Sequence, residues 1–366
     1  MEKVKQSGFK RFMNGYGIVI LTGLLIGAAA VALSRLGNPK NMGFCIACFL
    51  RDMAGAAKLQ TTGPQYFRPE IVGLVLGAML WSMIKKEWKP TGGSSPATRF
   101  CIGAGVMIGA LVFLGCPLRM VIRIGGGDLN ALIGLVGFIV GIVLGTIPLR
   151  FGFSLNRAYK QSMVEGLVFP VLLTVFFVFS VVTKIFAVNK AGHAFWLISL
   201  VIALVVGALC QQSRLCMAGG IRDVVMFRDF RLISGFAAIL AAVFLGNLIL
   251  GNFSPNAPEQ YALKFSFEGQ NAANTDGLLN FLGMFVVGYG SVLLGGCPLR
   301  QLILTGEGNT DSAVTVLGYI AGAALVHNFD LAGGATDGSH RRLYVLIAAL
   351  VIFALITVFN TRKQKA

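Results

Sequence analysis

The sequence predicts an all-α polytopic membrane protein. We expect about ten transmembrane helices in two inverted-topology five-span repeats, with re-entrant or half-helices that carry cysteine motifs. Three observations predict this fold class: an apolar composition, many apolar runs close to the roughly 20 residues that cross a bilayer, and two cysteine motifs that each occur twice.

The amino-acid composition indicates that most of the chain lies in a lipid bilayer. Of the 366 residues, 55% are hydrophobic and only 13% are charged, with a mean hydropathy of +0.76. Soluble domains carry about 25% charged residues. A net charge of +16 could indicate nucleic-acid binding, but the Lys and Arg residues lie in short loops between apolar runs and no nucleic-acid-binding motif occurs. We therefore expect membrane lipid around the chain and no nucleic-acid partner.

The first apolar segment, 17–35, follows a basic tail and is too long for the apolar part of a signal peptide, so we expect a retained first span. The candidate spans in chain order are 17–35, 70–84, 99–115, 129–148, 164–184, 193–210, 233–252, 278–295, 311–327 and 343–361.

The positive-inside rule orients these spans. With the N-terminus in the cytoplasm, the inside holds the tail 1–16, the loops 85–99, 150–160 and 212–231, and the tail 362–366. Together with Arg300, these segments contain 19 of the 31 Lys and Arg residues. The bias predicts a multi-pass protein of the cell (inner) membrane with both termini cytoplasmic and the polar loop 253–277 outside.

Two cysteine-bearing stretches, 42–58 and 213–227, are too short and too charged to cross a bilayer. Irregular backbone at membrane depth is tolerated only inside protein or beside a water-filled cavity. We therefore expect re-entrant segments here.

These stretches belong to an internal repeat. At an offset of 171, Cys45 falls on Cys216, and Arg51-Asp52 falls on Arg222-Asp223. At an offset of 181, the pentad Gly-Cys-Pro-Leu-Arg at 115–119 recurs at 296–300, and later glycines keep this register. We expect the long 253–277 loop to absorb the difference of ten residues.

Because the first span corresponds to the sixth, an odd number of spans separates equivalent elements, and the halves enter the membrane in opposite senses. This predicts a first repeat at 17–184 and a second, inverted repeat at 185–361. In such architectures the binding site lies near the midplane, at the repeat interface.

The pentad predicts a break between a span and a half-helix. Proline ends a helix and suits the first turn of the next one, so Gly115-Cys116-Pro117 and Gly296-Cys297-Pro298 should each place a cysteine at a half-helix N-terminus. Anions bind favourably there. Arg119 and Arg300 either add positive field or mark the membrane edge. A polarizable sulfur in such a field favours an anion with exposed sulfur or selenium.

The internal repeat supports a role in the transport pathway for some of the seven cysteines and not for others. Cys45, Cys116, Cys216 and Cys297 pair across the repeats and are candidate pathway residues, whereas Cys101 and Cys210 have no cysteine partner and fit simple packing. Cys48 falls on Gly219, so its role stays open. Cys45 and Cys48 also form a C-x-x-C that could be a redox pair of a membrane thiol oxidoreductase.

The two pentads, the glycine-rich segments after them and the segments around Cys45 and Cys216 resemble the YeeE/YedE family of sulfur-compound transporters over nearly the whole chain. The resemblance implies that cysteines along an hourglass-shaped path relay an anion such as thiosulfate. That role falls on Cys116, Cys297 and Cys45. The chain is more similar to the branch associated with selenium metabolism, and it differs from the thiosulfate branch in an extra N-terminal span and in Cys48.

The resemblance therefore implies a transporter, not an enzyme, that takes up a selenium compound or thiosulfate. We expect no catalytic residues, no cofactor and no metal. A cytoplasmic sulfur or selenium carrier protein is a candidate partner.

Overall fold

The structure is a computed structural model that describes residues 13–184, 188, 192–333 and 339–361. Residues 1–12 and 362–366 of the two predicted tails therefore lie outside the described residues. Long helices dominate the described part of the chain. They are α2 (Ile18–Arg35), α4 (Pro69–Ile84), α5 (Pro96–Phe113), α7 (Asn130–Arg150), α8 (Met163–Thr183), α9 (Trp196–Ser213), α11 (Arg231–Ile249), α12 (Gly277–Leu294), α14 (Thr310–Asn328) and α15 (Ser339–Asn360).

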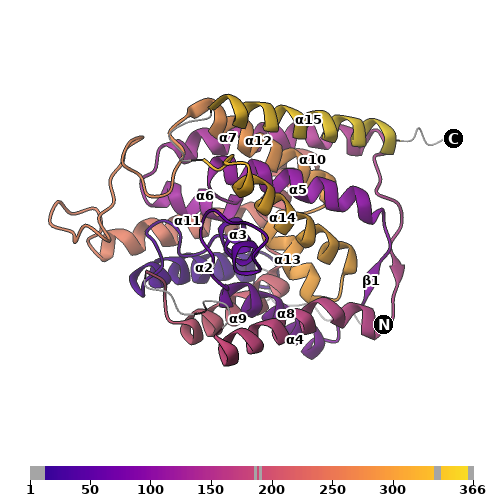
Figure 1. Ribbon diagram of the computed structural model, residues 1–366, viewed down its shortest axis with the longest axis horizontal. Coiled ribbons are helices and arrows are strands. Elements are labelled where there is room, and N and C mark those ends of the chain that lie inside the picture. Colours follow the sequence, from indigo (N-terminus) through magenta and orange to yellow (C-terminus); the bar gives the residue numbers. More distant parts are fainter. Residues whose placement is uncertain (1–12, 185–187, 189–191, 334–338, 362–366) are drawn as a thin grey trace.

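Four short helices lie between the long ones, and α3 and α13 appear near the centre of the molecule in Figure 1. They are α3 (Ile46–Ala56), α6 (Pro117–Gly125), α10 (Met217–Phe227) and α13 (Pro298–Gly306). A π-helical turn, η1 (Met13–Gly17), precedes α2, and the two-residue strands β1 (Thr91–Gly92) and β2 (Tyr159–Lys160) pair antiparallel. An 11-residue helix such as α3 is about 16 Å long, which is half of a bilayer core.

The prediction of an all-α polytopic membrane protein is confirmed. Each of the ten predicted spans coincides with one long helix. Within the described residues, eight helical stretches are long and apolar enough to cross a membrane. The other two predicted spans are α4, which has only 16 residues, and α14, whose first turn carries a buried aspartate, Asp311. Both pack among other helices, α4 against α9 and α13, and α14 against α5 and α3.

Several connections meet at one end of the helices. β1 and β2 join the α4–α5 connection to the α7–α8 connection. The Gly93 N–H donates to Asp311 Oδ1 (2.8 Å) at the start of α14, and the Ser154 N–H donates to the carbonyl of Asn360 (3.3 Å) at the end of α15. The loops predicted to be cytoplasmic are therefore neighbours in space.

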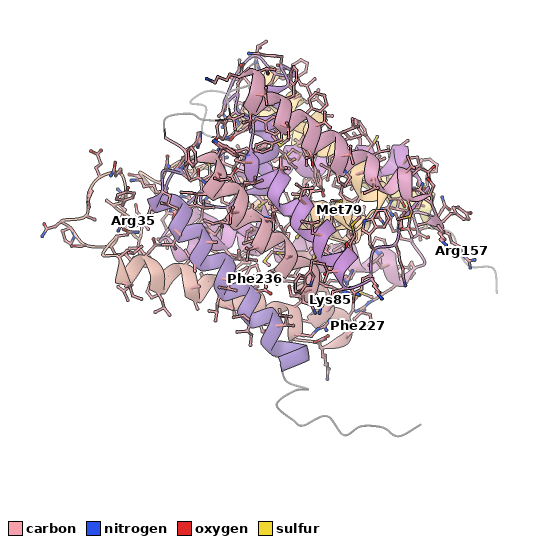
Figure 2. The ribbon with its side chains drawn as sticks, turned by 90° about the horizontal axis from the view of Figure 1, so that it is seen from below. Arg35, Met79, Lys85, Arg157, Phe227 and Phe236 are labelled. Atoms are coloured by element: carbon pink, nitrogen blue, oxygen red, sulfur yellow. The ribbon has the colours of Figure 1, made fainter. Side chains whose placement is uncertain are left out.

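The opposite end carries the α11–α12 connection, which projects at the left of Figure 1. Here Arg35, the last residue of α2, donates through Nη2 to the carbonyl of Leu250 (2.7 Å). Figure 2 shows Arg35 on one side of the molecule and Lys85, Arg157 and Phe227 toward the other. The predicted inside and outside loops therefore lie at opposite ends, while their assignment to the cytoplasm stays a prediction.

Helix contacts reproduce the 181-residue register. A Cβ atom on Gly137 of α7 would lie 2.1 Å from the carbonyl oxygen of Phe281 on α12. At the equivalent position, a Cβ on Gly318 of α14 would lie 2.4 Å from the carbonyl oxygen of Phe100 on α5. Both partners are also 181 residues apart. The two helix pairs thus pack through the same residues, and the glycines allow the backbones to approach closely.

The prediction that the 253–277 loop alone absorbs the ten-residue difference between the two repeat offsets was only partly right. The α11–α12 connection, 250–276, is longer than its counterpart 85–95, but the α10–α11 connection, 228–230, is much shorter than 57–68. The first half uses its longer α3–α4 connection to bring Arg68 back to α3, and the second half has no such segment.

Candidate functional site

The two pentads break helices as predicted. Leu114 and Gly295, which end α5 and α12, adopt left-handed backbone angles with φ of 62° and 79°. The next helices begin with Pro117 and Pro298 in their first turns. At this break the chain turns sharply and presents a new helix N-terminus to the protein interior.

Cys116 and Cys297 are the residues that precede α6 and α13, and both have extended backbone. The glycines before them leave room for the arginine that follows. A Cβ atom on Gly115 would lie 3.2 Å from Arg119 Cδ, and one on Gly296 would lie 3.0 Å from Arg300 Cγ. In each pentad the arginine side chain therefore packs closely against the glycine four residues before it.

Cys45 and Cys216 occupy the same position before α3 and α10. The Cys48 N–H donates to Cys45 Sγ (3.3 Å), and the Gly219 N–H donates to Cys216 Sγ (3.2 Å). Each sulfur thus caps the N-terminus of its helix, where free backbone N–H groups gather.

The structure brings the four repeated cysteines together in two pairs. The Cys45 and Cys116 thiols lie close enough to interact with each other, as do those of Cys216 and Cys297. The Cys297 N–H also donates to Cys216 Sγ (3.4 Å). All four side chains are buried. Each pair lies where two short helices point their N-termini at the same sulfur atoms, and contacts of α3 with α13 and of α6 with α10 join the two pairs.

Cys48 joins the first pair, and its role could not be settled from sequence. Its Sγ lies 2.8 Å from Cys45 Sγ and 3.7 Å from Arg119 Nη1. We call Cys45, Cys48 and Cys116 the first thiol cluster, and Cys216 and Cys297 the second thiol pair. The signal was the C-x-x-C spacing, which places both sulfurs on one face of a helix. A Cβ atom at Gly219, the counterpart of Cys48, would likewise lie 3.4 Å from Cys216 Sγ.

Cys101 and Cys210 lie apart from these groups, as their lack of a repeat partner suggested. Cys101 is exposed on the outer face of α5, and Cys210 is buried in α9.

The two pentad arginines have different surroundings. Arg119 is fully buried and donates to the carbonyl oxygens of Asn41 (2.9 Å), Leu114 and Asn271 (3.3 Å). It forms no ion pair within the described part of the chain. Arg300 instead pairs with Glu307 (2.9 Å). Arg119 is thus buried beside the first thiol cluster with no ion-pair partner among the described residues, which favours the positive-field interpretation for this arginine.

A buried charge cluster holds α3 in place. The Asp52 carboxylate accepts from Arg51 Nε (2.8 Å) and from Arg68 Nε (2.7 Å), and the Arg68 guanidinium also stacks on the rings of Phe49 and Tyr66, 4.7 Å from each centroid. Arg68 immediately precedes α4. The cluster therefore fixes α3, and with it Cys45 and Cys48, to the start of α4.

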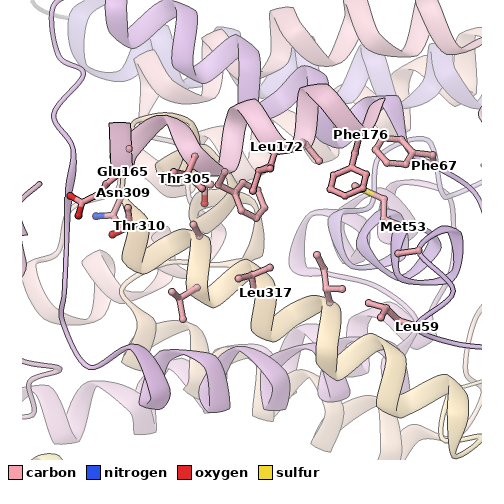
Figure 3. A pocket seen from close by; sticks show the side chains of 18 residues that line it. Met53, Leu59, Phe67, Glu165, Leu172, Phe176, Thr305, Asn309, Thr310 and Leu317 are labelled. Atoms are coloured by element: carbon pink, nitrogen blue, oxygen red, sulfur yellow. The ribbon is translucent and has the colours of Figure 1, made fainter. Parts of the chain in front are cut away.

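A cavity of about 480 Å³ lies elsewhere, between α8 and α14 (Figure 3). Glu165, Asn309 and Thr310 lie at one end, and apolar side chains such as Phe176 and Leu317 line the rest. No cysteine lines it among the described residues. It suits an apolar occupant and is separate from the thiols. Within the same residues, no group of three or more His, Cys, Asp or Glu side chains is placed to hold a metal ion.

Comparison with known proteins bears on the second half of the chain. Residues 212–361 match the family described as Sulphur transport. This half of the chain is similar to sulphur transporters. The matched region contains α10 through α15, and hence Cys216, Cys297 and the second pentad. No curated protein matches the chain. Together with the membrane-spanning helices, the match supports a membrane transporter.

Proposed function

We propose that the protein takes up a soft sulfur- or selenium-containing small anion across the membrane, and that Cys45, Cys116, Cys216 and Cys297 relay the anion. The observation that carries the proposal is the pairing of these thiols at converging helix N-termini in the protein interior. The match of residues 212–361 to the sulphur transport family agrees with it.

The chemistry of the thiol groups favours a soft anion. Helix N-termini attract anions of many kinds, and the uncompensated charge of Arg119 adds to this attraction. Discrimination must therefore come from the thiols. The S–H group is a weak donor that competes poorly with water for the hard oxygens of sulfate, whereas a polarizable terminal sulfur or selenium loses less hydration.

We also propose that 17–184 and 185–361 form inverted repeats with the thiols at their interface. The glycine contacts that recur at 181 residues support two copies of one packing unit. The ends of α2 and α9, which are counterparts in the repeat, support opposite insertion. The Ala194 N–H, just before α9, donates to Asn38 Oδ1 (3.1 Å), just after α2. The C-terminal end of α2 therefore lies beside the N-terminal end of α9, as expected if the two helices cross the membrane in opposite directions.

The identity of the anion, the membrane and the partner protein are proposed from the resemblance to the YeeE/YedE family alone. The resemblance favours a selenium compound as the transported anion, with thiosulfate as the alternative. Under the same proposal the protein lies in the cell (inner) membrane with both termini in the cytoplasm, and a cytoplasmic sulfur or selenium carrier protein receives the anion.

One observation favours a second candidate, a membrane thiol oxidoreductase. Cys45 and Cys48 place their sulfur atoms 2.8 Å apart. Such an enzyme would need both thiols of this pair, whereas the relay needs Cys116 and Cys297. The Cys48→Ala variant therefore separates the candidates, since it should retain uptake in a transporter and lose all activity in an oxidoreductase.

Competition binding on the purified protein tests the proposed function. Labelled thiosulfate should be displaced by unlabelled thiosulfate or selenide at least about tenfold more effectively than by sulfate, which corresponds to roughly 1.4 kcal/mol. If sulfate displaces the label as well as thiosulfate does, the soft-anion proposal is wrong.

A further inference from the structure

One buried polar group near the thiols has no partner. The Tyr319 side chain on α14 is fully buried, and its hydroxyl makes no hydrogen bond to any described residue. Buried hydroxyl groups normally find a partner, because an unsatisfied one loses its hydrogen bonds to water without replacement. The Tyr319 hydroxyl can therefore still donate a hydrogen bond to a group that enters from outside the protein.

The geometry of α14 aims this side chain into the protein. Leu317 faces the apolar cavity beside α8, and Gly318 contacts α5 through the Phe100 carbonyl. At 3.6 residues per turn, Tyr319 lies about 200° around the helix from Leu317, on the opposite side from the cavity. Val316 and Ala323, which share its face, are also fully buried.

The helix that carries the hydroxyl packs against one short helix of each thiol group. The hydroxyl is close enough to interact electrostatically with Cys116 of the first thiol cluster and with both members of the second thiol pair. α14 packs against both α3 and α13, the helices that begin beside Cys45 and Cys297.

The hydroxyl also breaks the internal repeat. In the 181-residue register Tyr319 falls on Phe138, which is equally buried. The ring is thus common to both halves and fits the packing, while the oxygen is present in only one. A ring of the same size without the oxygen is therefore compatible with this fold.

We propose that the Tyr319 hydroxyl donates a hydrogen bond to the oxygen end of the anion while thiols hold its soft atom, and so orients the anion between the first thiol cluster and the second thiol pair. This inference rests on the proposed function. A hydroxyl is a stronger donor than a thiol and suits a hard oxygen. Because the first half lacks this group, the anion meets different surroundings at the two ends of its path.

The test compares two anions on two purified variants. Thiosulfate has oxygens for the hydroxyl to bind and hydrosulfide has none. For Tyr319→Phe we expect thiosulfate to bind about tenfold more weakly, hydrosulfide to bind within about twofold of the wild-type value, and the melting temperature to stay the same or rise. The matched control is Tyr289→Phe, which removes a hydroxyl that bonds Thr357 (3.0 Å) away from the thiols. It should lower the melting temperature and leave both affinities unchanged.

The outcomes are separable. Unchanged thiosulfate binding by Tyr319→Phe would overturn the role of the hydroxyl and leave the proposed function intact. Equal loss for both anions, or a lower melting temperature, would show that the hydroxyl is structural and would also overturn it. Failure of the wild-type protein to bind either anion would overturn the proposed function and this inference with it.

Discussion

The substitution Asp52→Asn should destabilise the protein far more than the same change at its repeat counterpart, Asp223. Asp52 is fully buried and receives both guanidinium groups of its neighbours, with N–O distances of 2.6 Å to Arg51 and 2.5 Å to Arg68. Asparagine keeps the shape and removes the charge. Two buried cations would then remain, with Glu70 at 3.7 Å from Arg68 as their nearest carboxylate.

The burial of each ion pair determines how much unfolding free energy each substitution should cost. Breaking a buried ion pair by removing one partner costs about 3–5 kcal/mol, because the other charge stays buried and uncompensated. Asp223 has one partner, Arg222, and their side chains are 17% and 29% exposed. Water and salt can compensate there, so Asp223→Asn should cost about 0–1 kcal/mol.

Thermal unfolding in detergent, followed by the loss of monodisperse protein after heating, measures this difference. Asp52→Asn should lower the midpoint substantially, and Asp223→Asn should leave it within a few degrees of wild type. Because Asp52 anchors α3, the first variant should also weaken thiosulfate binding through displaced Cys45. Equal midpoints for the two variants would refute the argument that burial and double pairing make Asp52 special.

Three further predictions concern the relay, the helix contacts and the pentad arginine. Cys116→Ala should abolish uptake, whereas Cys101→Ala should leave it nearly unchanged, with insertion checked by membrane fractionation; equal activity of the two variants would contradict the relay. Gly141→Leu should prevent recovery of folded protein in size-exclusion chromatography, because even a Cβ atom would lie 2.3 Å from the Phe285 carbonyl, whereas Gly15→Ala, with open space around it, should be recovered normally. Arg119→Lys keeps the charge but cannot reach three carbonyl oxygens at once, so binding of thiosulfate should weaken about tenfold in competition assays, and wild-type affinity would show that charge alone suffices.

Much of the fold could be predicted because each element has a local cause. Apolar runs set the ten long helices, and the prolines of the pentads set the breaks before α6 and α13. The repeat singled out the four cysteines Cys45, Cys116, Cys216 and Cys297, but it did not predict that Cys45 lies beside Cys116 and Cys216 beside Cys297. In each of these cases the signal lies within a few residues or in a simple offset.

The remaining features depend on tertiary contacts that no local pattern encodes. Arg119 is buried because the chain brings carbonyls from three separate segments around it, which its position after the pentad does not reveal. Arg68 meets Asp52 across an irregular 57–68 connection. Tyr319 was missed because a tyrosine among apolar residues looks like packing. Its departure from Phe138 in the repeat register was the available signal.

Uptake by reconstituted protein tests the central claim most directly. Wild-type, Cys297→Ala and Cys210→Ala proteins are placed in liposomes, and accumulation of labelled thiosulfate, selenite and selenide is followed over time against empty liposomes. The account predicts uptake of at least one of these compounds by wild type and Cys210→Ala, and none above background by Cys297→Ala. Uptake by Cys297→Ala at the wild-type rate would contradict the cysteine relay.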